Sequence, residues 1–313
     1  MSADTAKSLI IGLGATGMSC ARYLASRNEA FFVADSRLKP PYLDDFQSQF
    51  PCVDIQLGGF QESALLSASR IIVSPGVSLK TPELIRARAA GIPISGDIDL
   101  FSREVTSSVV AVTGSNGKST VVEMLAAILD AAGKKYGLGG NLDSANAKPA
   151  LDLLLEQPKD LYVLELSSFQ LETTEALNAE VAVLLNVSID HMDRYEDMSE
   201  YLIAKQRIFR GCKKVVINRN EPHSTPQNRD FLPSIDFGFD RPGVNGLGLL
   251  QEGEDQYLAF QFEKIVSVSE LKIFGQHNIA NCLAAIGLAL SVGIEIKSIR
   301  KALIGFSGLP HRC

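Results

Sequence analysis

Short apolar runs alternate with segments of helical periodicity along most of this chain. Continuous runs of β-branched and aliphatic residues predict strands buried in a parallel sheet, and apolar residues spaced three and four apart predict helices that cover it. Strands are expected at residues 8–14, 30–34, 70–73, 92–94, 109–112, 161–164, 181–185 and 213–218. Helices are expected at residues 18–26, 82–90, 118–132, 151–156, 200–211 (with Ser199 as its N-cap), 279–292 and 298–304.

This alternation predicts an α/β protein, and a length of 313 residues suggests two domains. A helical connector is expected to begin at Gly96, so we place the domain boundary after residue 97. Between residues 221 and 272, Pro, Gly and Asn interrupt short β-like runs, which predicts a small peripheral antiparallel meander.

Composition narrows the class of protein. A net charge of −6 argues against nucleic acid as the main partner, because a basic stripe would be expected. The five cysteines are scattered, with no Cys-x-x-Cys pair, as in a reduced cytoplasmic protein. Residues 1–7 are polar and do not resemble a signal peptide, and no apolar run approaches the roughly 18 residues of a membrane span. We therefore expect a cytoplasmic protein without membrane insertion.

The first candidate site is a glycine loop at residues 12–17, with the sequence Gly-Leu-Gly-Ala-Thr-Gly, between a predicted strand and helix. The next strand ends at Asp35. This spacing is typical of a βαβ unit that binds a dinucleotide, with glycines that let a pyrophosphate approach and an acid that accepts from a hydroxyl. Two readings stay open for this loop alone, an NAD-dependent oxidoreductase and a turn that only packs helix on strand.

The second candidate site is the sequence Thr-Gly-Ser-Asn-Gly-Lys-Ser-Thr at residues 113–120, directly after an apolar strand. It indicates a phosphate loop in which backbone N–H groups and a helix N-terminus face the phosphates. Lys118 would supply a positive charge, and the Ser119 hydroxyl would coordinate magnesium. The match is partial, because Val112 stands where the full signature has glycine. The alternative is a strand-to-helix turn with a surface lysine.

Polar residues follow the next strands of this second domain. Glu165 ends an apolar strand downstream of the phosphate loop, where an acid commonly holds the nucleotide's magnesium. His191 lies between Asp190 and Asp193 after a further strand, which makes it a better site candidate than a lone histidine. By pattern alone, Lys205 is a solvated helix lysine.

Four motifs together resemble the Mur ligases, the ATP-dependent amide-forming ligases of peptidoglycan precursor synthesis. The motifs are Thr113–Thr120, Leu164–Glu172, Asn186–Tyr195, and Gly275-Gln276-His277-Asn278 with Asn281. The second motif is most similar to that of the ligases that add D-glutamate, and the resemblance covers the whole chain. It implies a Rossmann-like parallel-sheet domain at 1–97, a P-loop ATPase-type α/β domain with a small antiparallel sheet at 98–307, and the start of a C-terminal domain at 308–313.

The resemblance implies a role for each candidate residue. The positions that match UDP-substrate contacts are Gly14, Ala15, Thr16, Asp35, Ser36, Arg37, Gly76, Asn141 and His191. The positions that match ATP contacts are Gly114, Ser115, Asn116, Gly117, Lys118, Ser119, Thr120, Asn278, Asn281 and Arg312. Magnesium at two sites would be held by Ser119 and by Glu165, His191 and Lys205, the last as a carbamate; the catalytic residues would be Lys118, His191 and Lys205.

The implied reaction joins D-glutamate to UDP-N-acetylmuramoyl-L-alanine through an acyl phosphate, and the implied protein is a monomer. The family's third domain would supply the D-glutamate site, so we expect this chain to bind the UDP substrate without turnover. The alternatives are a module that binds UDP-sugar-peptide and ATP without catalysis, an NAD-binding oxidoreductase, and folylpolyglutamate synthetase, which lacks this kind of first domain.

Overall fold

The computed structural model describes residues 7–142, 144, 147–227 and 231–308. Packing separates them into two units, which we describe one at a time. The first holds the described residues up to Val105 together with 148–157 and 169–175, and the second holds the rest. The first unit is thus assembled from three separate parts of the chain. A sequence boundary at residue 97 stays a prediction.

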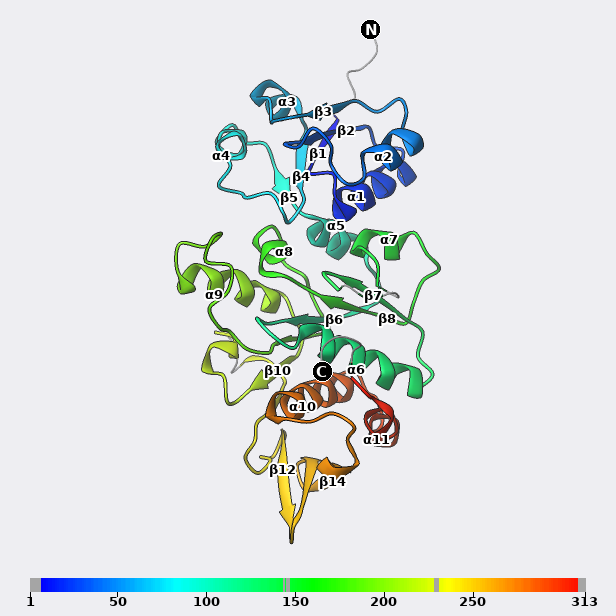
Figure 1. Cartoon of the computed structure of the whole chain (residues 1–313), viewed down its shortest axis with the longest axis vertical. Coiled ribbons are helices and arrows are strands. Elements are labelled where there is room, and N and C mark those ends of the chain that lie inside the picture. The colour runs from blue at the N-terminus through cyan, green and yellow to red at the C-terminus, as the bar shows by residue number, and fades with distance from the viewer. Residues whose placement is uncertain (1–6, 143, 145–146, 228–230, 309–313) are drawn as a thin grey trace. The chain divides into compact units, whose positions relative to one another are not determined.

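The first unit is a parallel sheet of five short strands with helices around it (Figure 1). Its elements are β1 (Ser8–Ile11), α1 (Ala15–Ser26), β2 (Phe31–Asp35), α2 (Leu43–Gln49), β3 (Ile55–Leu57), α3 (Glu62–Ser67), β4 (Arg70–Val73), α4 (Pro82–Ala89), β5 (Ile94–Ser95) and α5 (Asp97–Glu104). The strand order is β3-β2-β1-β4-β5. The loop after β1 therefore opens at the point where the strand order reverses, which is where ligands bind in such sheets.

Two later segments complete this unit. Helix α7 (Ala150–Leu154) brings Asp152 to Arg22 of α1, whose Nε donates to the carboxylate at 3.0 Å. The segment after α8 (Ser168–Glu172) reaches α5, where the Glu175 N–H donates to Asp99 at 3.1 Å. The first unit is therefore tied to residues far along the chain by buried and half-buried polar contacts.

The second unit is built on a nine-stranded sheet in the order β14-β13-β12-β11-β10-β9-β6-β8-β7. Its strands are β6 (Ser108–Thr113), β7 (Tyr136–Gly140), β8 (Leu161–Glu165), β9 (Val181–Leu184), β10 (Val215–Asn218), β11 (Ser234–Phe237), β12 (Gly246–Glu252), β13 (Asp255–Phe260) and β14 (Glu263–Ser267). The strands from β7 to β12 pair in parallel, and the pairs β12–β13 and β13–β14 are antiparallel. The predicted antiparallel meander is thus an extension of the main sheet.

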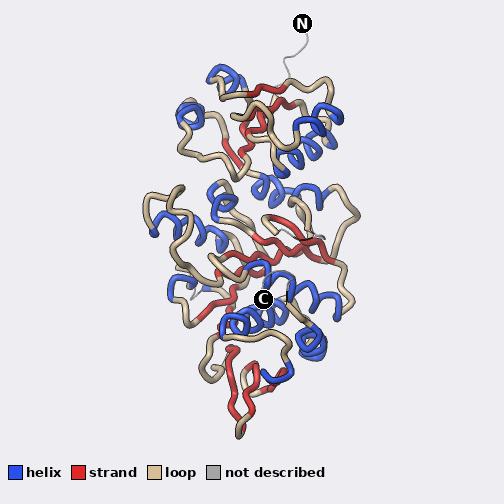
Figure 2. Tube along the Cα trace, viewed as in Figure 1, coloured by secondary structure: helices blue, strands red, loops and turns tan. Residues whose placement is uncertain are grey.

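Three helices pack around the core of the second unit, as the tube in Figure 2 shows. They are α6 (Lys118–Ala131), α10 (Gln276–Ser291) and α11 (Ile296–Gly305). Helix α10 is apolar on nearly all sides, and every residue from Cys282 to Ala289 is buried. Helix α9 (Met198–Gln206) continues into a short 3-10 turn, η1 (Arg207–Phe209). Two further 3-10 turns are η2 (Pro222–Ser224) and η4 (Val268–Glu270).

The α/β fold class and the predicted strands and helices are confirmed, with end points that shift by a few residues. The predicted cap of α9 is wrong. Asp197, not Ser199, precedes this helix, and its carboxylate accepts from the Glu200 N–H at 2.9 Å. The pattern also gave no signal for the short elements β3, α2, α3, α8 and β11, since each is too short for a period to show.

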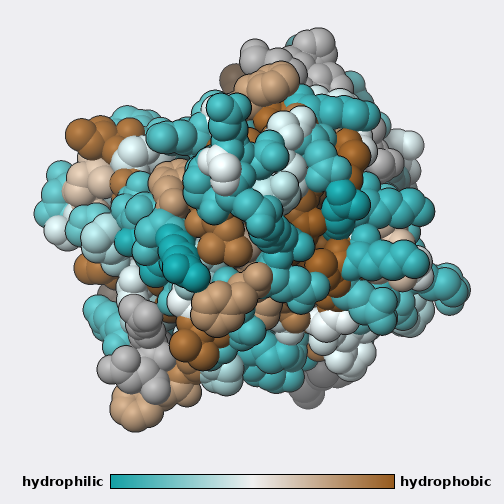
Figure 3. All heavy atoms as spheres, turned by 90° about the horizontal axis from the view of Figure 1, so that it is seen from below, coloured by the Kyte–Doolittle hydropathy of each residue, from teal (hydrophilic) through white to brown (hydrophobic). Residues whose placement is uncertain are grey.

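No described helix is long and apolar enough to cross a membrane. The face drawn in Figure 3 is largely hydrophilic, with hydrophobic side chains in patches between polar ones.

Candidate functional site

The phosphate loop lies between β6 and α6 in the middle of the second unit's sheet. Strand β6 is flanked by β8 and β9, so the loop opens where the strand order reverses. Gly117 adopts φ +82°, and an added Cβ would lie 2.5 Å from the Asn281 Oδ1 atom. Only glycine fits both the left-handed backbone and this close neighbour. The loop therefore has the strand–turn–helix context that a phosphate-binding loop requires.

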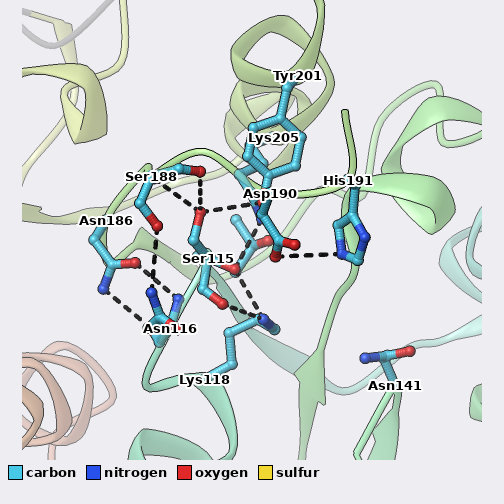
Figure 4. Close-up of polar contacts among 12 residues, drawn as sticks. Ser115, Asn116, Lys118, Asn141, Asn186, Ser188, Asp190, His191, Tyr201 and Lys205 are labelled. Atoms are coloured by element: carbon cyan, nitrogen blue, oxygen red, sulfur yellow. Dashed lines mark hydrogen bonds and ion pairs between the residues drawn. The ribbon is translucent and has the colours of Figure 1, made fainter. Parts of the chain in front are cut away.

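Two lysine side chains meet at one carbonyl of this loop. The Lys118 Nζ atom donates to Gly114 O at 2.9 Å and to Ser115 O at 3.1 Å, and the Lys205 Nζ atom donates to the same Gly114 O at 2.8 Å (Figure 4). Lys205 is 2% exposed, so the expectation of a solvated helix lysine is wrong. Burial, reinforced by the positive charge of Lys118, lowers the pKa of Lys205 to about 7.

The ring of Tyr201 covers this buried amine. The Lys205 Nζ atom lies 4.7 Å from the ring centroid, one helical turn along α9, and the Tyr201 hydroxyl lies 3.1 Å from the Ser115 Oγ atom. Tyr201 is fully buried. Helix α9 therefore reaches the phosphate loop through both side chains.

Glu165 ends β8 beside this loop and is 3% exposed. Its Oε1 atom accepts from the Asn141 amide at 3.3 Å, and its Oε2 atom is buried without a hydrogen-bond partner among the described residues. A buried carboxylate oxygen without a donor is costly unless a cation or a donor completes it. This atom fits a bound magnesium ion.

The described residues hold no cluster of three or more His, Cys, Asp and Glu side chains that could bind a metal. The predicted ligand set contributes one carboxylate, from Glu165, and one imidazole, from His191. Magnesium prefers oxygen ligands, so the set fits this ion only if Lys205 or the substrate supplies further oxygen.

His191 lies on the loop after β9. Its backbone adopts φ +56°, its side chain is 43% exposed, and its Nε2 atom lies 3.4 Å from Asp190. The ring faces Tyr201 edge-on, with 6.3 Å between ring centroids. His191 thus stands on the same side of the loop as Lys205, while Asn141 lies apart from both (Figure 4).

A cleft of about 1080 Å³ opens over the phosphate loop, which is enough for a nucleotide. The predicted residues that line it are Ser115, Asn116, Gly117, Lys118, Ser119, Thr120, Asn141, Glu165, Asn278 and Asn281. Gly114, His191 and Lys205 lie close by but outside this lining, and Arg312 lies outside the described residues. The structure thus brings together residues 166 positions apart in sequence, from Ser115 to Asn281.

Part of the lining was missed at the level of sequence. It includes Asn218, Asn220, Glu221, Phe237 and Phe239, whereas Asn186 and Ser188 lie within the motif at residues 186–195. A signal existed for Asn218, which ends the apolar strand β10 as Glu165 ends β8. Carboxyl ends of parallel strands share one edge, so the polar residue after each strand is a site candidate.

The glycine loop of the first unit divides its glycines by role. An added Cβ on Gly17 would lie 1.9 Å from Gly12 O, and one on Gly12 would lie 2.9 Å from the Ser74 Cβ atom. An added Cβ on Gly14 would meet nothing within 4 Å. Gly12 and Gly17 are therefore required for packing, whereas Gly14 faces open space where a ligand could approach.

The carboxylate of Asp35 already accepts hydrogen bonds from neighbouring groups of the protein. Its carboxylate accepts from the Leu13 N–H at 2.7 Å and from the Arg37 side chain at 2.7 and 2.8 Å. Burial opposes ionisation of Asp35, but Arg37 and the backbone donors outweigh it and lower its pKa. This engagement limits what Asp35 can still accept, whether from a ribose hydroxyl of NAD or from the predicted UDP substrate, so it does not separate these two readings. The other predicted UDP contacts, Ala15, Thr16, Ser36 and Gly76, follow β1, β2 and β4 at the same edge of the sheet.

The sequence was compared with family models and known proteins. A model of the MurD-like N-terminal domain of Mur ligases matches residues 6–96, and a model of the Mur ligase middle domain matches residues 112–289. The chain belongs to the Mur ligase family. UDP-N-acetylmuramoylalanine–D-glutamate ligases from Pseudomonas aeruginosa and Marinobacter nauticus are 50% and 45% identical to it, over 97% and 98% of this chain. The chain spans about two thirds of their length, 67% and 68%.

Solved Mur ligase structures share the fold. UDP-N-acetylmuramate:L-alanyl-γ-D-glutamyl-meso-diaminopimelate ligase from Neisseria meningitidis matches 98% of this chain and 100% of that chain with a TM-score of 0.65 and 20% identity. UDP-N-acetylmuramate–alanine ligase from Thermotoga maritima matches 98% of this chain and 70% of that chain with a TM-score of 0.59 and 21% identity. The expected Mur ligase fold is therefore confirmed.

Proposed function

We propose that this Mur ligase family member is part of an ATP-dependent amide ligase that adds D-glutamate to UDP-N-acetylmuramoyl-L-alanine. One observation carries the proposal: two lysine amines converge on the phosphate loop beside the unsatisfied carboxylate of Glu165. The D-glutamate ligase names of relatives near 50% identity support the choice of substrate.

The phosphate loop and Lys118 would bind ATP. In the proposed reaction the L-alanyl carboxylate oxygen attacks the γ-phosphorus, the bond to the bridging oxygen breaks, and ADP leaves. The amine of D-glutamate then attacks the acyl phosphate carbonyl, loses a proton, and inorganic phosphate leaves. Two anions meet in the first step, so Lys118 lowers its barrier by offsetting charge at the phosphates.

Magnesium would be held by Ser119 at the nucleotide and by Glu165, His191 and Lys205 at a second site. When bound, it would neutralise phosphate charge. Lys205 can serve there only after its amine changes charge. An unprotonated amine adds to dissolved carbon dioxide, forming an N–C bond and releasing a proton, and the carbamate so formed carries anionic oxygen. The low exposure of Lys205 and the nearby charge of Lys118 favour the unprotonated amine.

The UDP group would lie over the glycine loop of the first unit, at Gly14 and the residues after β2 and β4. Asn141 and His191 would contact the muramoyl part. A monomer in the cytoplasm stays a prediction, as does the inability of this 313-residue chain to turn over.

The binding experiment uses the 313-residue chain in a thermal-shift assay with a non-hydrolysable ATP analogue plus magnesium, UDP-N-acetylmuramoyl-L-alanine, or NAD. A ligand that binds the folded state raises the unfolding temperature. We expect shifts with the first two ligands, and we expect Lys118→Ala to lose only the nucleotide shift. Lys297→Ala, at an exposed lysine of α11, is the matched control. Stabilisation by NAD alone would refute the proposal.

A phosphate-release assay with ATP, UDP-N-acetylmuramoyl-L-alanine and D-glutamate separates catalysis from binding. Steady release that requires all three substrates would show that this chain is itself the ligase, against our expectation of binding without turnover. The carbamate has its own readout: ¹³C NMR in ¹³C-bicarbonate should show a carbamate signal that disappears in Lys205→Arg.

A further inference from the structure

Asn186 makes contacts that neither the motif nor the proposed chemistry explains. It follows β9 directly, at the point where β6 and β9 have just paired through the Leu185 N–H and Thr113 O at 2.9 Å. Its own backbone oxygen accepts from the Ser115 N–H at 3.0 Å. The main chain of Asn186 thus extends the sheet into the phosphate loop.

The side chain of Asn186 hydrogen-bonds to the next residue of the loop, Asn116. Its Oδ1 atom accepts from the Asn116 N–H at 2.9 Å, and its Nδ2 atom donates to Asn116 O at 3.0 Å (Figure 4). These two bonds reproduce the pair that a neighbouring strand would make with Asn116. A single carboxamide therefore satisfies both backbone groups at the tip of the loop.

The remaining carbonyls of the loop are also engaged. Gly114 O and Ser115 O accept from Lys118, and Gly117 O accepts from the Val121 N–H at 3.0 Å. Because Asn116 O accepts from Asn186, the four successive carbonyl oxygens of residues 114–117 all accept hydrogen bonds from within the protein. A loop whose carbonyls are turned inward is shaped for an anion, because the carbonyls would otherwise repel phosphate.

We propose that Asn186 is a positioning residue for triphosphate binding: its carboxamide holds the Asn116 backbone so that the loop has its phosphate-receiving shape before nucleotide arrives. This inference rests on the proposed nucleotide site. Preorganisation of this kind strengthens binding because the loop loses less conformational freedom when the ligand binds.

The test compares Asn186→Ala with Asn186→Leu, which removes the same polar groups while keeping most of the volume. Calorimetry measures binding of a non-hydrolysable ATP analogue plus magnesium and, separately, of UDP-N-acetylmuramoyl-L-alanine. Loss of two hydrogen bonds predicts nucleotide binding about tenfold weaker in both variants, with UDP-substrate affinity unchanged. Asn245→Ala, at an exposed asparagine before β12, is the matched control and should bind both ligands as the unmodified chain does.

Hydrogen–deuterium exchange without nucleotide separates positioning from direct contact. A positioning role requires the Asn116 amide to exchange about tenfold faster in Asn186→Ala before any ligand is added, and a residue that only touches ATP would not change it. Nucleotide affinity within twofold of the unmodified chain in both variants, or an unchanged Asn116 exchange rate, would overturn the inference. Failure of the unmodified chain to bind nucleotide would instead overturn the proposed function, and this inference with it.

Discussion

Asp97 is a buried carboxyl group whose ionisation should cost stability. It begins α5, is 2% exposed, and its Oδ1 atom has no hydrogen-bond partner among the described residues. Burial raises its pKa from 3.8 to about 6, although the Ile98 N–H and the Gln170 side chain donate to it and act in the opposite direction. We expect Asp97→Asn, which keeps the shape and removes the charge, to stabilise the first unit at neutral pH.

The sign and size follow from the two pKa values. The folded protein keeps the Asp97 proton up to about pH 6, whereas the unfolded chain releases it near 3.8. Between these values the folded state binds more protons, so stability falls as pH rises and the full cost is reached above about pH 6. A shift of about two units corresponds to about 3 kcal/mol, which is the upper limit of the gain from Asp97→Asn at pH 7.5.

Urea unfolding followed by circular dichroism at pH 4.5, 5.5 and 7.5 measures this effect. The difference in unfolding free energy between Asp97→Asn and the unmodified chain should grow with pH and level off above about pH 6. Asp45→Asn, at an exposed carboxylate of the same unit, is the control and should give a difference that does not follow this course. A constant difference for Asp97→Asn at all three pH values would refute the reasoning, because burial would then not set the ionisation of this group.

Three further predictions concern small residues and thiols. Gly17→Ala should lower the free energy of unfolding by more than about 2 kcal/mol, because its Cβ would lie 1.9 Å from a backbone carbonyl oxygen. Gly14→Ala should change it by less than about 0.5 kcal/mol, because its Cβ would meet nothing within 4 Å. Equal effects of the two substitutions in urea unfolding would contradict the different roles of these glycines. Gly117→Ala should cost about 1–3 kcal/mol in the same assay, since an L side chain is strained at φ +82°, and a neutral result would show that the loop relaxes freely. Iodoacetamide at pH 7.5 should label exposed Cys52 in the folded protein and spare Cys282, whose pKa burial raises to about 12; mass spectrometry of the labelled peptides checks this, and rapid labelling of Cys282 would show that α10 opens.

The sequence predicted the sheet and the two glycine loops because their signals are local. Apolar runs such as Val109–Val112 and Leu161–Leu164 bury both faces of a strand, and the glycine spacing marks the turns that follow. The place of Glu165 beside the phosphate loop follows from the same logic, since both end strands of one parallel sheet.

The burial of Lys205 could not be predicted from local sequence patterns. The sequence around it has only weak helical asymmetry, and its partner, the Gly114 carbonyl, is 91 residues away. Its burial depends on how α9 packs against the phosphate loop, which no local pattern records. The ion pair between Asp35 and Arg37 was missed for a different reason, because the two residues are only two positions apart. An acid at the end of a strand gives the same sequence pattern whether a ligand or a neighbouring guanidinium binds its carboxylate.

The discontinuous first unit constrains the order in which this chain can fold. Arg22 meets its partner only when Asp152 has been made, and the Asp99 carboxylate, which Arg103 of the same helix already contacts at 2.7 Å, gains its second donor at Glu175. During synthesis, which proceeds at about 5–20 residues per second, all five strands of this sheet have been made by Ser95, several seconds before residues 152 and 175. The contacts that join residues 148–157 and 169–175 to the first unit can therefore form only after residue 175 has been synthesised, although segments of the second unit precede both stretches in the chain.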